Sequence, residues 1–253
     1  MKVTLLGTGT SQGVPVIACE CPVCNSLDYR DKRLRVSVHL EVDGKSFIID
    51  SGPDFRQQIL RERIKKLDAL IFTHEHKDHT AGMDDIRAFN FSQHKDMPVY
   101  AEERVIHQLQ NEFSYIFSGI NYPGIPRVQV HPITEEPFKI EGITFTPIRA
   151  MHYKLPVLGF RVKDFTYITD ANFISEPEKE KIKGSEIVIL NALRKEPHIS
   201  HFSLSEAITL LEELQPKQAY LTHISHLLGF HAEVEKELPN FIKLAYDGLK
   251  LNC

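Results

Sequence analysis

The chain has 253 residues, of which 42% are hydrophobic and 25% charged, and its formal net charge is −4 with histidine neutral. This ordinary globular composition excludes a disordered, collagen-like or coiled-coil chain, and the slightly acidic balance argues against a general nucleic-acid binder. The sequence contains no run of about 18 apolar residues, so no membrane span is predicted. The N-terminal residues lack a signal-peptide pattern. We therefore expect a cytoplasmic protein with no membrane partner.

In the first half of the chain, strand and helix patterns are mixed. Residues 2–6 predict a strand that runs into a glycine-rich loop at 7–13. Asp43-Gly44, between two apolar runs, is typical of a two-residue hairpin turn. Asp54 is a candidate N-cap for the helix that follows it. The other elements expected here are strands at 36–42, 46–50, 68–74 and 98–101, helices at 55–66, 80–92 and 102–113, and a loop at 114–127.

The second half begins with closely spaced strand patterns, as in a meander. Hairpin strands with helices at intervals predict an α/β (α+β) layered sandwich, and no linker divides the chain, so we expect one domain over residues 1–253. The strands are expected at 128–131, 138–140, 143–149, 157–163, 165–169, 187–190 and 219–222, with helices at 203–214 and 231–237 and two terminal strands.

The strongest chemical signal is the segment THEHKDHT at residues 73–80, at the end of an apolar strand. His74 and His76 are two residues apart, so in an extended chain they project to the same side. Asp78 and His79 follow in a turn and can point back to the same space. Neutral imidazoles suit Zn, Fe or Mn, and a carboxylate suits a hard divalent cation. This segment therefore predicts parts of two adjacent metal sites.

The motif closely resembles the His-x-His-x-Asp-His motif of the metallo-β-lactamase-fold hydrolases, and the resemblance extends from the glycine loop to His226. It implies a four-layer αββα sandwich with two catalytic divalent metals, Mn or Zn. Three further ligands expected at later strand ends match His152, Asp170 and His223. The resemblance implies one metal held by His74, His76, His152 and Asp170, and a second held by Asp78, His79, Asp170 and His223, with Asp170 and a hydroxide as bridges.

Three of the four cysteines, Cys19, Cys21 and Cys24, lie within six residues. Four cysteines in a chain of this size do not make a disulfide framework, so metal ligation is the better interpretation. His226, three residues beyond His223, can complete a Cys₃His site for one structural zinc ion. The alternative is three reduced cysteines without a metal.

His201 precedes a predicted helix whose Ser203 and Glu206 form a capping-box pattern. A histidine held at such a turn could face the metals as the general acid, and His198 is the nearby competitor. Together with the cysteine motif, His201 resembles the cyclic-phosphate phosphodiesterases of the carbon–phosphorus lyase pathway. That resemblance implies hydrolysis of a small phosphodiester, with a cyclic sugar phosphate as one such substrate, by a metal-activated hydroxide, with Asp78 and His201 as catalytic residues.

Three alternatives to this function stay open. The same ligands serve thioester and lactone hydrolases. An RNA 3′-end nuclease would need a basic arm that the short segment 114–127 does not provide, so no nucleic-acid partner is expected. A zinc-binding accessory protein, related to one of pyrroloquinoline-quinone biosynthesis, is disfavoured by the full ligand set. The family also suggests a homodimer. Asp50 and Asp54 are either partners of the histidine ligands or turn and cap residues, and Arg87 and Arg149 either bind phosphate or are solvated.

Overall fold

The computed structural model describes residues 1–119 and 122–253 and contains two β-sheets packed face to face. In the first sheet the strand order is β15-β1-β2-β3-β4-β5-β6; β15, β1, β2 and β3 pair antiparallel, and β3 to β6 pair parallel. Its strands are β1 (Lys2–Gly7), β2 (Ser37–Val42), β3 (Lys45–Ile49), β4 (Ala69–Ile71), β5 (Met97–Ala101), β6 (Val128–Pro132) and β15 (Lys250–Asn252).

The second sheet repeats this division into an antiparallel and a parallel half. Its order is β11-β8-β9-β10-β12-β13-β14, with β7 paired to β8; β10, β12, β13 and β14 pair parallel, and the other neighbours pair antiparallel. Its strands are β7 (Phe138–Ile140), β8 (Ile143–His152), β9 (Leu155–Val162), β10 (Phe165–Tyr167), β11 (Phe173–Ile174), β12 (Ile187–Asn191), β13 (Gln218–Thr222) and β14 (Ile242–Leu244).

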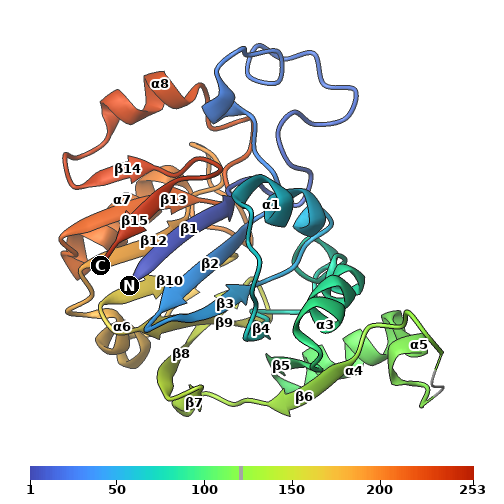
Figure 1. The fold of residues 1–253 in the computed structure, drawn as a ribbon. Helices are drawn as coiled ribbons and strands as arrows, with labels where there is room; N and C mark the ends of the chain where they lie inside the picture. Colours follow the sequence, from blue (N-terminus) through green and yellow to red (C-terminus); the bar gives the residue numbers. More distant parts are fainter. Residues whose placement is uncertain (120–121) are drawn as a thin grey trace.

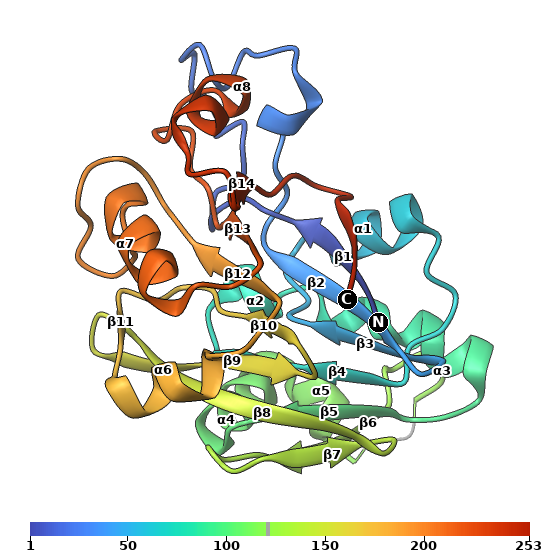
Figure 2. The same cartoon turned by 90° about the vertical axis from the view of Figure 1, so that its left-hand side faces the viewer.

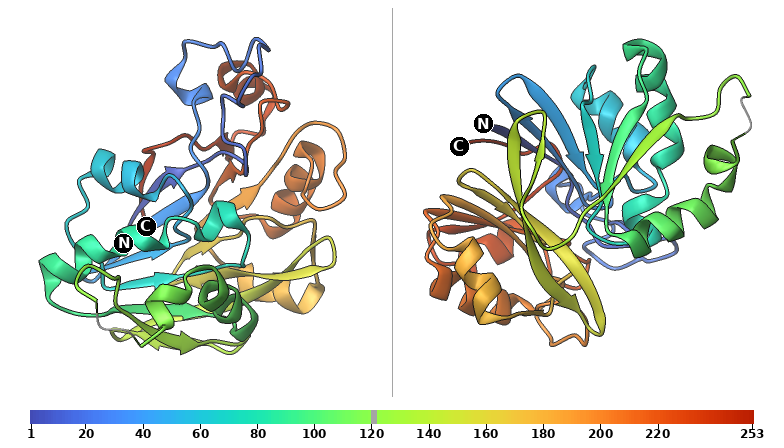
Figure 3. Two further views of the ribbon diagram at one scale, coloured as in Figure 1. Left: turned by 90° about the vertical axis from the view of Figure 1, so that its right-hand side faces the viewer. Right: turned by 90° about the horizontal axis from the view of Figure 1, so that it is seen from below.

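Helices cover the outer face of each sheet (Figures 1 and 3). Apolar side chains between the sheets, such as Phe47, Phe145 and Phe160, form the central core, and separate clusters lie beneath the two helical layers. The helices are α1 (Phe55–Glu62), α2 (Lys77–Thr80), α3 (Arg87–Gln93), α4 (Glu103–Glu112), α5 (Ser114–Phe117), α6 (Glu176–Ile182), α7 (Leu204–Leu214) and α8 (His231–Val234), with 3₁₀ turns η1 (Tyr29–Asp31), η2 (Met83–Ile86) and η3 (Glu235–Glu237). The predicted αββα sandwich is confirmed.

Local signals account for several of the elements. Asp43 and Gly44 both have positive φ, 49° and 76°, as the tight hairpin turn between β2 and β3 requires. Ser203 accepts from the backbone of Glu206, whose side chain accepts from the backbone of Ser203, so the predicted capping box opens α7.

Four local predictions were wrong. Helix 80–92 is three pieces, α2, η2 and α3, because the backbone at Gly82 lies against the Gly52 carbonyl, only 2.1 Å from where a Cβ at Gly82 would sit. Helix 55–66 ends at Glu62, since Arg63 is left-handed. Asp54 is not a side-chain cap, because its carboxylate instead accepts from the backbone and guanidinium of Arg35.

The fourth wrong prediction concerns the loop at 114–127, where residues 114–117 form α5 and residues 120–121 lie outside the described residues. Helix α6 was missed, although Ser175 before it, Pro177 in its first turn and two glutamates there are helix-start signals. Among the described residues, no helix is both long and apolar enough to cross a membrane.

Candidate metal centre

The histidines and aspartates predicted as ligands come together at one edge of the two sheets. His74 and His76 follow β4, Asp78 and His79 lie on α2, and His152 ends β8. Asp170 follows β10, and His223 follows β13. Parallel strands end at the same edge, so residues up to 149 positions apart in the sequence become neighbours. Their donor atoms form two clusters, and within each cluster the atoms lie within 4.8 Å of one another.

The first cluster contains His74, His76, His152 and Asp170. His74 Nε2 lies 3.0 Å from His76 Nδ1 and 3.8 Å from Asp170 Oδ2. The rings of His76 and His152 have centroids 5.2 Å apart. His74 is fully buried, whereas His76 is exposed, so the cluster opens to solvent on the side of His76.

The second cluster contains Asp78, His79, Asp170 and His223, all buried. His79 Nε2 lies 3.2 Å from Asp78 Oδ2 and 3.5 Å from Asp170 Oδ2. His223 Nδ1 lies 2.8 Å from Asp170 Oδ1. Asp170 therefore belongs to both clusters, and its role as a bridge between two cations stays a prediction.

Hydrogen bonds around the clusters orient two of the imidazoles. His79 Nδ1 contacts Asp50 Oδ2 at 2.7 Å, and His152 Nδ1 contacts the Ser200 carbonyl at 2.7 Å. Because both partners are acceptors, Nδ1 carries a proton in each ring and Nε2 faces the cluster. Of the two interpretations offered for Asp50, a partner of the histidines or a turn residue, the structure therefore agrees with the first.

The backbone around the clusters is held in unusual conformations. Asp50, Asp170 and His223 all have left-handed backbones, with φ of 64°, 56° and 54°. Gly52 packs so closely on α2 that a Cβ there would lie 2.0 Å from the Asp78 carbonyl oxygen. A left-handed backbone costs free energy at residues other than glycine, and such residues often occur at functional sites. All three of these residues lie at the two clusters.

The charges of the second cluster depend on one another. Burial opposes charge on Asp78, His79 and Asp170, but the two carboxylates raise the pKa of His79 well above its usual value. In the same way, His223 and His79 outweigh burial and lower the pKa of Asp170. Burial lowers the pKa of His74 in the first cluster. A proton on His79 and a cation compete for the same carboxylates, so metal binding would release protons.

His201 lies between the two clusters. Its ring stacks on His223 with centroids 4.7 Å apart and lies 4.5 Å from the ring of His152. Burial, followed by the charge of His223, lowers the pKa of His201 to about 3. His198 lies farther out, with its ring centroid 5.2 Å from that of His201, and Ser200 holds its Nδ1. Of the two candidates for the general acid, His201 is the one in ring contact with a residue of each cluster.

The cysteine motif and His226 form a third cluster. The loop that carries the cysteines lies beside the C-terminal segment around α8 (Figure 2). The sulfur atoms of Cys19, Cys21 and Cys24 lie 3.3, 3.3 and 3.6 Å from His226 Nδ1. A tetrahedron with Zn–S about 2.3 Å and Zn–N about 2.0 Å has S···N edges of about 3.5 Å, which matches these distances.

The cysteines of this cluster differ in acidity. The Cys24 backbone N–H, followed by His226, lowers the pKa of Cys21 to about 6. Burial raises the pKa of Cys24 to about 11. A bound cation would favour the thiolate form of both.

The two His/Asp clusters fit a pair of divalent cations. Among the described residues, the buried Nε2 of His79 has no hydrogen-bond partner, although two carboxylate oxygens lie within 4 Å of it. A buried nitrogen that faces carboxylates without a hydrogen bond is a donor atom arranged for a cation. Imidazole and carboxylate donors suit Zn, Mn or Fe.

Other predicted residues lie elsewhere. Arg87 pairs with Asp84, and Arg149 pairs with Glu102 and Glu135, so both arginines already have acidic partners. A signal that sequence reasoning did not use is a threonine directly before three of the candidate ligands, His74, Asp170 and His223. Thr73, Thr169 and Thr222 are fully buried; the Thr73 hydroxyl donates to Asp50 and the Thr169 hydroxyl to Asp170.

This fold and these clusters define a metal-dependent hydrolase with a metallo-β-lactamase fold. The sequence pattern of the beta-lactamase superfamily domain matches residues 45–224. The chain belongs to the beta-lactamase superfamily.

Three known proteins illustrate the similarity. A crystal structure of a diphosphatase from the PhnP family is 41% identical, with a TM-score of 0.93, over 100% of this chain and 97% of that chain. An octanoyltransferase of Porphyromonas gingivalis is 38% identical over 99% of this chain but only 51% of its own length. Zinc-bound PqqB from Methylobacterium extorquens shares the fold, with a TM-score of 0.81 at 18% identity and full coverage of both chains. This chain spans about half the length of these curated relatives, the octanoyltransferase and a coenzyme PQQ synthesis protein B of Rhodopseudomonas palustris.

Proposed function

We propose that this chain is a phosphodiesterase that hydrolyses a small phosphodiester, for which a cyclic sugar phosphate is one candidate. The observation that carries the proposal is His201, which stacks on His223 and lies against His152, one residue from each cluster. A proton donor between two cation sites suits a reaction in which a leaving oxygen departs. The 41% identity to a diphosphatase supports chemistry at phosphorus.

The ligand sets follow the two clusters. One cation would be held by His74, His76, His152 and Asp170, and the other by Asp78, His79, Asp170 and His223. When bound, two divalent cations supply Lewis acidity that lowers the pKa of water and neutralises charge on phosphoryl oxygens. Manganese and zinc both suit these donors, and a structural zinc would be held by Cys19, Cys21, Cys24 and His226.

The remaining roles in the proposed reaction belong to side chains and backbone groups of the protein. Asp50 and the Ser200 carbonyl keep the rings of His79 and His152 in the orientation that ligation needs. Asp78, whose Oδ2 lies 3.2 Å from His79 Nε2, would add negative charge beside the second cation and is, with His201, a proposed catalytic residue. His201 is the proposed proton donor to the leaving oxygen; because burial lowers its pKa, it would take up that proton when the negatively charged phosphodiester binds beside it. The two sheets share one core, which supports treating residues 1–253 as one domain.

The test is hydrolysis of bis(p-nitrophenyl) phosphate by the full chain loaded with Mn or Zn, with metal content measured on the same sample. We expect turnover that needs added metal and disappears in Asp170→Asn. Cyclic phosphates would then be compared as substrates. Full metal loading without turnover of any small phosphodiester, cyclic or acyclic, would overturn the proposal.

Thioesters provide the second substrate class in that test. The octanoyltransferase relative is about twice as long as this chain, so its named activity concerns a protein with a further half. Turnover of an octanoyl thioester in the absence of phosphodiester turnover would reassign this chain to acyl substrates. Turnover of neither, with all metals bound, would favour an accessory role.

A further inference from the structure

Glu75 lies between the two histidines of the first cluster, and its carboxylate contacts an arginine from another element. In an extended segment, a residue between two that face one side projects to the opposite side. The Glu75 carboxylate forms an ion pair with Arg104 Nη1, from the first turn of α4. Arg104 therefore contacts the segment of His74 and His76 through Glu75, on the side opposite to the two histidine side chains.

The same guanidinium also contacts the second sheet. Arg104 Nη2 donates to the carbonyl of Pro156 in β9. Pro156 is paired with Met151 in β8, directly before His152. One planar group thus joins the segment that supplies two histidines to the hairpin that supplies the third.

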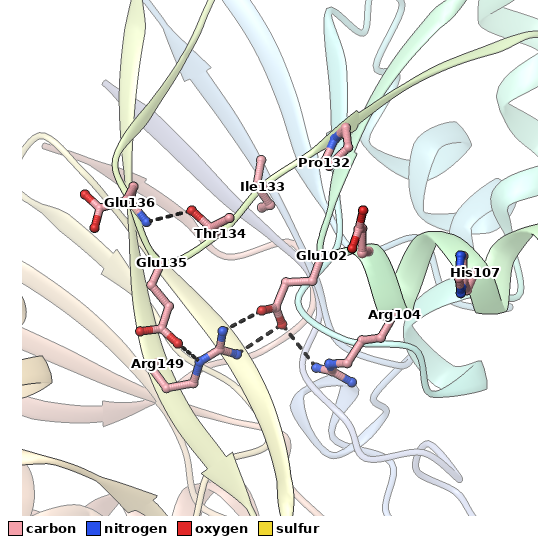
Figure 4. Close-up of a pocket in the computed structure, with 10 residues that line it drawn as sticks. Glu102, Arg104, His107, Pro132, Ile133, Thr134, Glu135, Glu136 and Arg149 are labelled. Carbon is pink, nitrogen blue, oxygen red and sulfur yellow. Dashed lines mark hydrogen bonds and ion pairs between the residues drawn. The ribbon is translucent and has the colours of Figure 1, made fainter.

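A basic residue in the first turn of a helix is electrostatically unfavourable, because the helix dipole is positive there. Carboxylates on both sides compensate for it: Glu75, and Glu102, whose Oε2 lies 3.3 Å from Arg104 Nη2. Glu102 in turn pairs with Arg149 of β8, which also contacts Glu135 (Figure 4). The ion pairs therefore continue from the first sheet to the second along one wall of a cavity of about 830 Å³.

We infer that Arg104 is a positioning residue for the first metal cluster, an inference that rests on the proposed metal centre. It acts through Glu75 and the Pro156 carbonyl. His74 and His76 come from the first sheet and His152 from the second, so the geometry of the cluster depends on the spacing between sheets. Arg104 sets that spacing with charge-assisted hydrogen bonds to both sides. Groups outside the ligand shell that orient ligands typically change metal affinity by about 10–100-fold.

The test is the metal affinity of Arg104→Ala and Arg104→Lys, measured by competition with a chromophoric chelator. Lysine keeps the charge, but its single ammonium lacks the planar fork that reaches Glu75 and Pro156 together. We expect one cation per chain to bind about 10–100-fold more weakly in both variants, with the cysteine cluster unchanged. The absorption of Co²⁺ separates the clusters, because thiolate ligation adds charge-transfer bands that His/Asp sites lack.

The matched control is Glu103→Ala. Glu103 neighbours Arg104 and lines the same cavity, but among the described residues it is Arg104, not Glu103, that pairs with Glu75. It should keep wild-type metal affinity. The double variant Glu75→Gln/Arg104→Ala should be no weaker than Arg104→Ala alone, because the arginine acts on this segment through Glu75.

Unchanged metal affinity in folded Arg104→Ala and Arg104→Lys would overturn the inference. A fall in melting temperature with unchanged affinity would leave Arg104 only a structural role and would also overturn it. The wild-type protein separates this outcome from failure of the proposed function. Tight metal binding without phosphodiester turnover contradicts the function, while the affinity comparison still decides the role of Arg104.

Discussion

His79 Nδ1 lies 2.7 Å from Asp50 Oδ2, and both side chains are fully buried. The other carboxylate oxygen of Asp50 accepts from the Thr73 backbone N–H, and the Thr73 hydroxyl also donates to this carboxylate. One aspartate thus fixes the residue before His74 and the ring of His79. Asp50 links the first metal cluster to the second without being a ligand of either.

Asp50→Asn should weaken metal binding. Asparagine tolerates the left-handed backbone at this position, but its amide replaces one acceptor by a donor that faces His79 or Thr73. We expect metal affinity or turnover to fall by about 10–100-fold, measured by chelator competition and steady-state kinetics. Asp54→Asn is the control, since Asp54 pairs with Arg35 instead. Equal behaviour of the two variants would contradict this role of Asp50.

His201→Ala should reveal a general acid through its dependence on the leaving group. With an alkyl leaving group, loss of a positioned acid should reduce kcat by about 10²–10⁴-fold. With p-nitrophenolate, which leaves without a proton, the reduction should be much smaller. Metal content should stay at the wild-type value. His198→Ala is the comparison, and a larger loss there than in His201→Ala would move the role of the acid to His198.

Cys24→Ser should remove one metal ion and keep the other two. Cys24 is buried in the Cys₃His cluster, where the three sulfurs surround His226 Nδ1. A structural zinc contributes folding free energy, so the melting temperature should fall as well. Metal analysis by mass spectrometry and thermal unfolding measure both effects. Cys253→Ser, at the half-buried C-terminus, serves as control. Loss of all three metals would show that the clusters are not independent.

His39 should make the protein less stable in mild acid. Burial lowers its pKa to about 4, whereas the unfolded side chain titrates near 6.5. At a pH between these two pKa values, His39 is protonated in the unfolded state and neutral in the folded state. The free energy of unfolding therefore falls as the pH drops below 6.5, and the fall levels off below pH 4. His39 contributes up to about 3 kcal/mol to this fall.

The variant His39→Gln tests this assignment, because glutamine can keep the hydrogen bond to Ser46 but does not titrate. Urea unfolding at pH 7.5 and at pH 5 gives the stability difference for each protein. We expect a smaller difference in the variant than in the wild type. The same difference in both would mean that other groups cause the acid sensitivity.

Much of the fold could be predicted because its signals are local. The apolar strands, the Asp43-Gly44 turn and the Ser203 capping box each act over a few residues. The helix at 80–92 could not be predicted correctly, because Gly82 meets the carbonyl of Gly52, thirty residues earlier in the chain. Asp54 failed as a cap for the same kind of reason, since Arg35 competes for its carboxylate.

The grouping of the candidate ligands could be anticipated because each follows an apolar strand, and strand ends meet at one edge of a sheet. Their orientation could not. The Ser200 carbonyl that holds His152 and the arginine that holds Glu75 come from elements whose approach depends on packing of the two sheets. Metal ligation by the individual residues, a homodimer and a cytoplasmic location stay predictions.

Strands β1 and β15 pair antiparallel, so that Met1 and Cys253 lie side by side, with the Cys253 N–H 3.0 Å from the Met1 carbonyl oxygen. Both ends of the chain lie at the end of β1 opposite the glycine loop, away from the metal edge (Figure 1). A short linker between them, with new ends opened at the exposed β7–β8 turn, would give a circularly permuted protein in which every candidate ligand keeps its place at the end of its strand or on its helix. Such a permutant should still bind metal, since the centre is assembled by sheet order and not by the order of segments along the chain.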